Sequence, residues 1–270
     1  NGELGRGLRC RHQTEPRHIQ GLDGKGVVDL ACGDYSSFAV THQGEFWSWG
    51  ENTMGQLGLG HTKNTDTPQV CPWIPKEEVM KVAAGAYHTL LLCAHERVLS
   101  FGQNDKGVLG NGQRGGPECW TTPQLLEPLL GKGIVDIQCG TMHGVALGKS
   151  AKTNHSRVFT WGWNCHGQLG LAGMAQGDVC IGGKAVEGLM HKDVVCIAAG
   201  AYHTIAVTSD NQVYVWGDNR FGQLGVDSMT THAVGTDIIK CPQPVMVPKE
   251  VPYKWSELIP SDPEPHDDEP

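Results

Sequence analysis

The stretch VVCIAAGAYHTIAVTSDNQVYVWGDNRFGQLGVD, residues 194–227, is one of four related segments in this chain of 270 residues; the others begin at Val27, Val79 and Ile134. Each segment has an apolar run that ends in glycine, then an aromatic residue followed by glycine, then a turn of the form Gly-x-Leu-Gly. The first glycine recurs at intervals of 52, 55 and 60 residues. Self-similarity at such a period indicates a repeat architecture.

Each unit is predicted to form one blade of four antiparallel strands. Its apolar runs are about five residues long and rich in β-branched and aromatic residues, which is typical of strands. A proline near the end of three units suits an outer edge strand, because proline has no N–H to donate to a central ladder; these are Pro68, Pro123 and Pro242. Radial repetition of such blades is a β-propeller, so we predict an all-β fold with four complete repeats.

The strings GAYHT, VYVWGDNRFGQLG and FWSWGENTMGQLGLG resemble repeats of the regulator of chromosome condensation family, over residues 27 to about 248. The resemblance implies a seven-bladed ring, which four units would leave incomplete. Residues 2–7 align with the turn 55–60, so residues 1–26 are predicted to be the tail of a preceding unit, a partial fifth repeat. We expect a fragment of a larger protein; the alternative is an intact chain that closes its ring with a second copy or a partner.

Residues 1–250 are therefore predicted to form one propeller, with repeats starting near residues 27, 79, 134 and 194. Residues 251–270 contain five prolines and six acidic residues with few apolar ones. Such a composition cannot bury a core, so this tail is predicted to be disordered.

Three sets of recurrent residues are predicted to be structural. Glycine ends the first strand of every unit, at Gly33, Gly85, Gly140 and Gly200. Histidine lies three positions later in three units, where a hydrogen bond between blades explains its regularity: His88, His143 and His203, with Ser36 in the first unit. Tryptophan precedes the second glycine, as part of the blade core, at Trp49, Trp161 and Trp216, with Phe101 in the second unit.

No covalent catalytic site is evident in the sequence. The histidines are spaced about one blade apart, so they do not converge on a metal ion unless they line the axis closely. None of the ten cysteines forms a Cys-x-x-Cys pair. We therefore expect no metal and no cofactor, assign no catalytic residue, and predict an intracellular protein with reduced thiols.

Photoreception is also disfavoured. One branch of the resembling family is a plant ultraviolet-B receptor with sensing tryptophans in Gly-Trp-Arg-His-Thr strings. Tyrosine or methionine stands at the matching positions here, at Tyr35, Tyr87, Met142 and Tyr202.

Departures from the repeat are the better functional candidates, because irregular loops on a rigid scaffold carry binding. The segment 148–157 (GKSAKTNHSR) lengthens a hairpin and concentrates basic residues in an acidic protein: Lys149, Lys152, His155 and Arg157. It is either a solvated loop or a contact for an acidic partner. The segment 171–190 is interpreted as a second insertion, glycine-rich and without repeat character.

A net charge of −8 argues against a nucleic-acid or chromatin partner. No run of 18 apolar residues is present, so no membrane span is expected. The resemblance leaves two functions: a protein-docking module, with a small GTPase as the expected class of partner, or a guanine-nucleotide exchange factor for a small Ran-like GTPase. The acidic C-terminal segment favours the cytoplasm over the nucleus. The unpaired edges of an open propeller also favour self-association.

Overall fold

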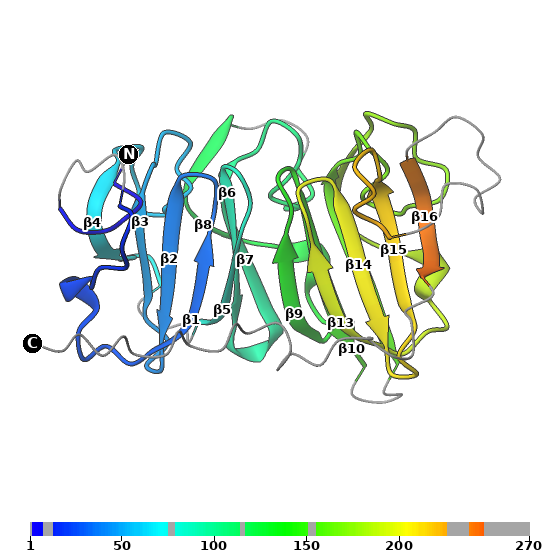
Figure 1. The fold of residues 1–270 in the computed structure, drawn as a ribbon, viewed down its shortest axis with the longest axis horizontal. Coiled ribbons are helices and arrows are strands. Elements are labelled where there is room, and N and C mark those ends of the chain that lie inside the picture. Colours follow the sequence, from blue (N-terminus) through cyan, green and yellow to red (C-terminus); the bar gives the residue numbers. More distant parts are fainter. Residues whose placement is uncertain are drawn as a thin grey trace, which may run out of the picture.

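The structure is a computed structural model that describes residues 2–7, 13–74, 79–113, 117–150, 155–225 and 238–245. Its strands form four antiparallel sheets, and in each sheet four strands follow one another in chain order. Figure 1 shows the sheets as successive blades along the long axis of the molecule. The predicted all-β fold of four-stranded propeller blades is confirmed. The predicted tail at residues 251–270 lies outside the described residues.

Sixteen strands make up the four blades. The first blade contains β1 (Val27–Cys32), β2 (Ser36–Thr41), β3 (Phe46–Gly50) and β4 (Thr65–Val70). The second contains β5 (Val79–Ala84), β6 (His88–Cys93), β7 (Arg97–Gln103) and β8 (Cys119–Leu125). The third contains β9 (Ile134–Cys139), β10 (His143–Lys149), β11 (Ser156–Trp163) and β12 (Val179–Ala185). The fourth contains β13 (Val194–Ala199), β14 (His203–Thr208), β15 (Val213–Asp218) and β16 (Ile238–Val245).

Among the described residues, helical structure is limited to four short 3₁₀ turns. Three of them precede the first strand of a blade, and one lies in the hairpin between β6 and β7. They are η1 (Gln20–Leu22), η2 (Ala94–Glu96), η3 (Glu127–Leu129) and η4 (Glu187–Leu189).

The first strands of the blades line the inner side of the array, because β1 contacts β5, β5 contacts β9 and β9 contacts β13. The fourth strands lie at the outer edge of their sheets, and Pro68, Pro123 and Pro242 all lie there. One prediction is wrong: much of the segment 171–190 belongs to the repeat. It supplies β12, the outer strand of the third blade, and η4. The sequence shows no sign of this strand because β12 lacks the proline found in the other outer strands and contains Gly182 and Gly183.

The aromatic–glycine pair has a physical cause in every blade. The ladder between the third and fourth strands is irregular at this glycine, at Gly50, Gly102, Gly162 and Gly217. Their φ angles lie between +104° and +111°, in the region that favours glycine. A Cβ atom there would also lie only 2.3–2.6 Å from a backbone carbonyl oxygen of the same blade. Glycine is therefore required by both conformation and space.

The core lies within and between the blades. Its largest fully buried side chains are those of Trp161, Trp216, Phe38 and Phe101. In the first three blades a buried hydroxyl group also connects the third strand to the Gly-x-Leu-Gly turn of the same blade, called the closing turn below; β15 of the fourth blade has Val215 at this position. Ser100 Oγ donates to the Leu109 carbonyl at 2.8 Å, and Thr160 Oγ1 donates to the Leu169 carbonyl at 2.7 Å. The blades thus form a rigid frame for the loops at their ends.

Candidate protein-docking surface

Consecutive blades are joined through the repeated tryptophans. Trp161 Nε1 donates a hydrogen bond of 2.9 Å to the carbonyl of Val108, in the closing turn of the preceding blade. Trp216 Nε1 donates in the same way to the Gln168 carbonyl at 2.8 Å. The turn has room for the ring because its last residue is glycine: a Cβ at Gly110 would lie 2.6 Å from the Trp161 ring. These tryptophans therefore hold blade to blade.

The N-terminal segment makes the same contact with the first blade. Trp49 Nε1 donates to the Glu3 carbonyl at 2.8 Å, and a Cβ at Gly5 would lie 2.8 Å from the Trp49 ring. Ser37 Oγ donates to the same Glu3 carbonyl, also at 2.8 Å. Residues 2–7 thus occupy, for the first blade, the place that a closing turn occupies for the other three.

Each recurrent histidine is the first residue of the second strand of its blade, in β6, β10 and β14. His143 Nε2 is 3.0 Å from Thr204 Oγ1 of the next blade, which is a hydrogen bond between blades. Among the described residues, neither ring nitrogen of His88 has a hydrogen-bond partner, although the His143 backbone lies close to this ring. His203 is half-buried and makes no side-chain hydrogen bond to the described residues. The regular spacing of these histidines therefore reflects burial more than a repeated hydrogen bond.

Burial also sets the protonation state of two of these rings. His88 and His143 are almost completely shielded from solvent, with 1% and 0% of their surface exposed. Desolvation lowers the pKa of His88 to about 4, and the nearby His143 backbone offsets this only in part. Desolvation, together with the neighbouring histidines, lowers the pKa of His143 to about 3. Both rings are therefore neutral near pH 7 and form part of the frame.

The glycines that follow the first strand of each blade, called the unit glycines below, allow neighbouring blades to approach each other closely. A Cβ at any of the first three would lie 2.5–2.6 Å from the carbonyl oxygen of the unit glycine in the next blade. At three of the four positions it would also lie within 2.2 Å of the histidine ring of its own blade. Larger residues would separate the blades at Gly33, Gly85, Gly140 and Gly200.

The basic hairpin predicted from the sequence lies at the opposite ends of the blades. It joins β10 to β11, and Ser150 N donates to the His155 carbonyl at 3.0 Å near its tip. Its base is tied to the linker that precedes the third blade, since Lys149 N donates to the Gly133 carbonyl at 2.8 Å. The predicted contact residue Lys152 lies outside the described residues.

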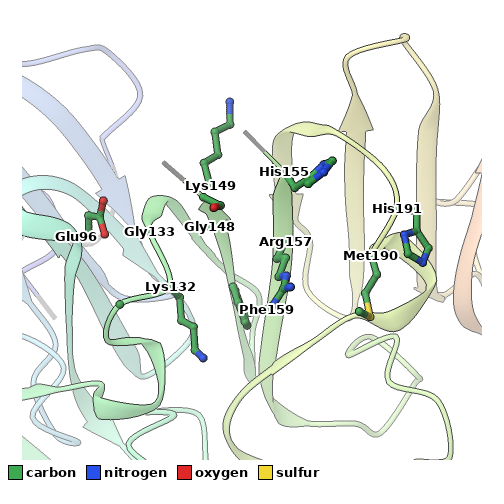
Figure 2. Close-up of a pocket in the computed structure, with 12 residues that line it drawn as sticks. Glu96, Lys132, Gly133, Gly148, Lys149, His155, Arg157, Phe159, Met190 and His191 are labelled. Atoms are coloured by element: carbon green, nitrogen blue, oxygen red, sulfur yellow. The ribbon is translucent and has the colours of Figure 1, made fainter. Parts of the chain in front are cut away.

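A hollow of about 960 Å³ lies beside this hairpin. Three of the four predicted contact residues line it, namely Lys149, His155 and Arg157. Figure 2 shows Arg157 and Phe159 in the middle, with Glu96 on one side and His191 on the other. The structure thus brings the irregular hairpin together with segments of the neighbouring blades.

Sequence reasoning missed the contributions of these other segments. Lys132 comes from the linker before β9, Met190 and His191 come from the linker before β13, and Glu96 comes from η2. A signal for Lys132 was present, because Gly131-Lys132-Gly133 repeats the earlier Gly24-Lys25-Gly26. The signal for Glu96 and His191 was absent, since only the packing of adjacent blades places them here.

The hollow is predominantly basic. The described part of its lining contains three cationic side chains and two histidines, against a single carboxylate, Glu96. Lys132, Lys149 and Arg157 form no salt bridge with any described residue. Elsewhere such pairs do form: Lys81 of β5 binds Asp136 of β9 across two blades. The positive charge of the hollow is therefore not neutralised within the described part of an otherwise acidic protein.

A second polar cluster lies at the other end of the blades, after β15. Arg220 binds Asp218, with Nη2 2.9 Å from Oδ2, and hydrogen bonds to Arg220 hold the pKa of the Asp218 carboxyl below its usual range. The His166 ring meets the Tyr202 ring edge-on, with centroids 5.1 Å apart. Because its two charges neutralise each other, this cluster offers less for an ionic partner than the basic hollow does.

The two outermost blades expose surfaces that are buried in the inner ones. Leu30 of β1 is 66% exposed, whereas Ile137 at the same position of β9 is fully buried. A hollow of about 820 Å³ lies between Leu30 and the N-terminal segment. In the fourth blade, a Cβ at Gly222 or Gly225 would meet no atom within 4 Å, unlike those of the other closing turns.

Among the described residues, no helix is long and apolar enough to span a membrane. Within the same part of the chain, no three His, Cys, Asp or Glu side chains gather as they would around a metal ion.

The repeat geometry agrees with comparisons of known proteins. A family model described as RCC1-like domain matches residues 1–257. The chain belongs to the RCC1-like domain family. The predicted resemblance to the regulator of chromosome condensation family is thereby confirmed.

The RCC1-like relatives are longer proteins, and this chain matches only a segment of each. The human E3 ubiquitin-protein ligase HERC2 is 37% identical over 235 residues, which cover 86% of this chain but 5% of HERC2. The Ultraviolet-B receptor UVR8 of Arabidopsis thaliana is 35% identical over 225 residues, covering 83% of this chain and 48% of UVR8. The chain thus spans less than half the length of these curated relatives.

Solved structures support the RCC1-like fold. Human WBSCR16 superposes with a TM-score of 0.74 and 24% identity, over 92% of this chain and 60% of that one. Yeast RCC1 (Prp20), in its complex with Kap60, superposes with a TM-score of 0.67 and 24% identity, over 85% and 51%. At this identity the likeness establishes the fold alone.

Proposed function

We propose that this RCC1-like chain is a protein-docking module that binds its partner through the blade ends around the basic hollow. The observation that carries the proposal is the hollow itself. Its hairpin departs from the repeat, and its Lys149 and Arg157 side chains serve no salt bridge within the described frame. A loop that the repeat does not explain, on a frame this regular, is suited to binding.

A small GTPase is the class of partner that we propose. Prp20p from Saccharomyces cerevisiae is a solved structure with a similar fold, and it is described as binding Gsp1p and histones. It superposes with a TM-score of 0.60 but is only 18% identical, so the partner is not transferred by similarity alone. A basic surface also suits a GTPase, provided that the contacting region of the GTPase is acidic.

Nucleotide exchange is the alternative function. An exchange factor needs no covalent chemistry, because it binds the nucleotide-free GTPase more tightly than the loaded form. The rigid frame and the polar clusters at both ends of the blades are compatible with such differential binding. The same experiment tests docking and exchange.

The test immobilises the full chain and measures binding of purified small GTPases, Gsp1p included, in GDP-loaded, GTP-loaded and EDTA-stripped forms. Docking predicts saturable binding that weakens in the variant Arg157→Glu. Exchange predicts preference for the stripped form and faster release of a fluorescent GDP analogue. If no GTPase in the panel binds in any form, the proposed class of partner is wrong.

We also propose that the outer faces of the array associate with further blades, with residues 1–26 belonging to a preceding unit. The exposed Leu30 and the unoccupied turn at Gly225 support this proposal. Sedimentation velocity of the full chain at several concentrations tests for self-association. The substitution Leu30→Lys should reduce any association, because a charge would enter the apolar contact.

Finally, we propose a reducing compartment, with the cytoplasm favoured. Eight cysteines are free in the described part of the chain, including the buried Cys71 and Cys93. Free thiols in this number are typical of reducing compartments. Fluorescence microscopy of the tagged chain would decide between cytoplasm and nucleus.

A further inference from the structure

The basic hollow is assembled from three blades. Its walls are the turn η2 of the second blade, the β10–β11 hairpin of the third blade, and the linkers that precede β9 and β13. In Figure 2 the side chains of Lys132 and Lys149 point in opposite directions, so the cationic groups are spread along the hollow. Such a distribution suits an extended ligand better than a single small anion.

The base of the hairpin is held in place from both sides. Lys149 N donates to the Gly133 carbonyl at 2.8 Å on one side. On the other side, Ser156 Oγ donates to the Lys192 carbonyl at 3.1 Å. Ser156 is itself 1% exposed, so the start of β11 is fixed next to the second linker. These bonds fix the backbone that carries the cationic residues, so less backbone entropy is lost when a ligand binds.

Two glycines allow the linker and the hairpin to approach each other. A Cβ at Gly133 would lie 2.0 Å from the Lys149 carbonyl oxygen. A Cβ at Gly148 would lie 2.4 Å from the Lys132 carbonyl oxygen. Side chains at either position would push the two lysine-bearing segments apart.

The hollow also has an apolar component. Phe159 lines it and is 4% exposed, whereas the side chain of Met190 is 43% exposed. Methionine is flexible and polarisable, and it adapts to varied apolar partners. A ligand with one apolar side chain among carboxylates would match both the charge and this exposed sulfur-bearing side chain.

We propose that the hollow binds an acidic linear segment of a partner protein, with its carboxylates paired to Lys132, Lys149 and Arg157 and an apolar residue against Met190. The proposal rests on the docking function above and specifies the chemistry that is recognised. Charge complementarity carries it, because the cations have no carboxylate partner among the described residues. The acidic segment 251–270 of this chain is a competing occupant, which the test must separate.

The test uses the full chain and a fluorescein-labelled peptide of eight glutamates with a central leucine, followed by fluorescence anisotropy. The matched control peptide replaces every glutamate with glutamine. We expect only the acidic peptide to bind, more weakly at 300 mM than at 50 mM NaCl because salt screens exposed charges. Lys132→Gln and Arg157→Gln should each weaken binding about two- to fivefold, as is typical of exposed charge pairs.

A lysine at the other end of the blades provides the control variant. Lys63 is exposed in the loop between β3 and β4, so Lys63→Gln changes the net charge equally without touching the hollow. This variant should bind the peptide like the unmodified chain. Equal affinity of the unmodified chain and the triple variant Lys132→Gln, Lys149→Gln, Arg157→Gln would overturn the proposal. A far-ultraviolet circular dichroism spectrum of each variant establishes that it is folded.

Two further measurements separate the competing occupants. A full-chain variant with amides in place of the six acidic side chains of residues 251–270 tests the chain's own segment. If this variant binds the peptide more than about tenfold more tightly, the segment occupies the hollow and the proposed occupant is wrong. A short DNA duplex that displaces the peptide at lower concentration than unlabelled peptide would instead indicate a nucleic-acid site. Failure of the GTPase assay alone would leave this proposal standing, because the peptide assay contains no GTPase.

Discussion

Acidification should destabilise the protein through two buried histidines. The pKa of His88 is lowered to about 4 and that of His143 to about 3, whereas an exposed histidine has a pKa of about 6.5. Between these values the unfolded chain binds protons that the folded chain does not. Stability is therefore fully present above about pH 6.5 and is lost progressively as the pH falls toward the folded values.

The size of the effect follows from the same values. At pH 5 an unfolded-state imidazole is mostly protonated, while the rings of His88 and His143 stay neutral in the folded protein. Relative to pH 7, each ring should lower the free energy of unfolding by about 2 kcal/mol. The two together should account for about 4 kcal/mol, which is a large part of the stability of a typical domain.

Guanidinium unfolding, followed by tryptophan fluorescence at pH 7 and pH 5, measures this loss. Serine is the natural replacement, because Ser36 occupies the same position in the first blade. His88→Ser and His143→Ser should each reduce the loss between the two pH values by about 2 kcal/mol. The control His191→Ser should not, because that ring is exposed.

The prediction is refuted if the double variant loses as much stability between pH 7 and pH 5 as the unmodified chain does. Serine leaves space in the core, so the variants are expected to be less stable at both pH values. If they do not fold, nitrogen-15 NMR of the imidazoles in the unmodified chain provides the test. Two protonated rings in place of the expected neutral ones at pH 5 would then contradict the reasoning.

Three other predictions follow from the contacts between and within blades, and urea unfolding measures the first two. Trp161→Phe should lower the free energy of unfolding by about 1 kcal/mol, because one hydrogen bond is lost. Trp161→Ala should lower it by about 3–5 kcal/mol, because a cavity remains. Equal losses of stability in the two variants would contradict the role of the ring. Gly110→Ala should destabilise more than Gly131→Ala, because both have positive φ but only the first would place a Cβ against a tryptophan ring. Burial raises the pKa of the Cys93 thiol to about 12, so Ellman's reagent should modify the exposed Cys32 in the folded protein and leave Cys93 unmodified until denaturant is added.

The family and the blade were predictable because they depend on local, repeated chemistry. The positive-φ glycine represented by Gly102 recurs in all four units, and the outer-strand proline recurs in three, so the copies reinforce one another. The prediction for residues 171–190 was wrong for the same reason. Their strand β12 lacks the proline that marks the other outer strands, and strand pairing with β11, rather than composition, determines its place.

The sequence by itself thus determined the all-β repeat, the family, and the basic character of the hairpin 148–157. Only the tertiary structure decided which residues that hairpin meets. Lys132, Glu96 and His191 lie on separate segments of the chain, and their proximity results from the packing of three blades side by side. Burial likewise decided the protonation of His88 and His143, because desolvation depends on neighbours that are distant in sequence. Repetition records how one blade is built, whereas a binding surface arises where different blades meet.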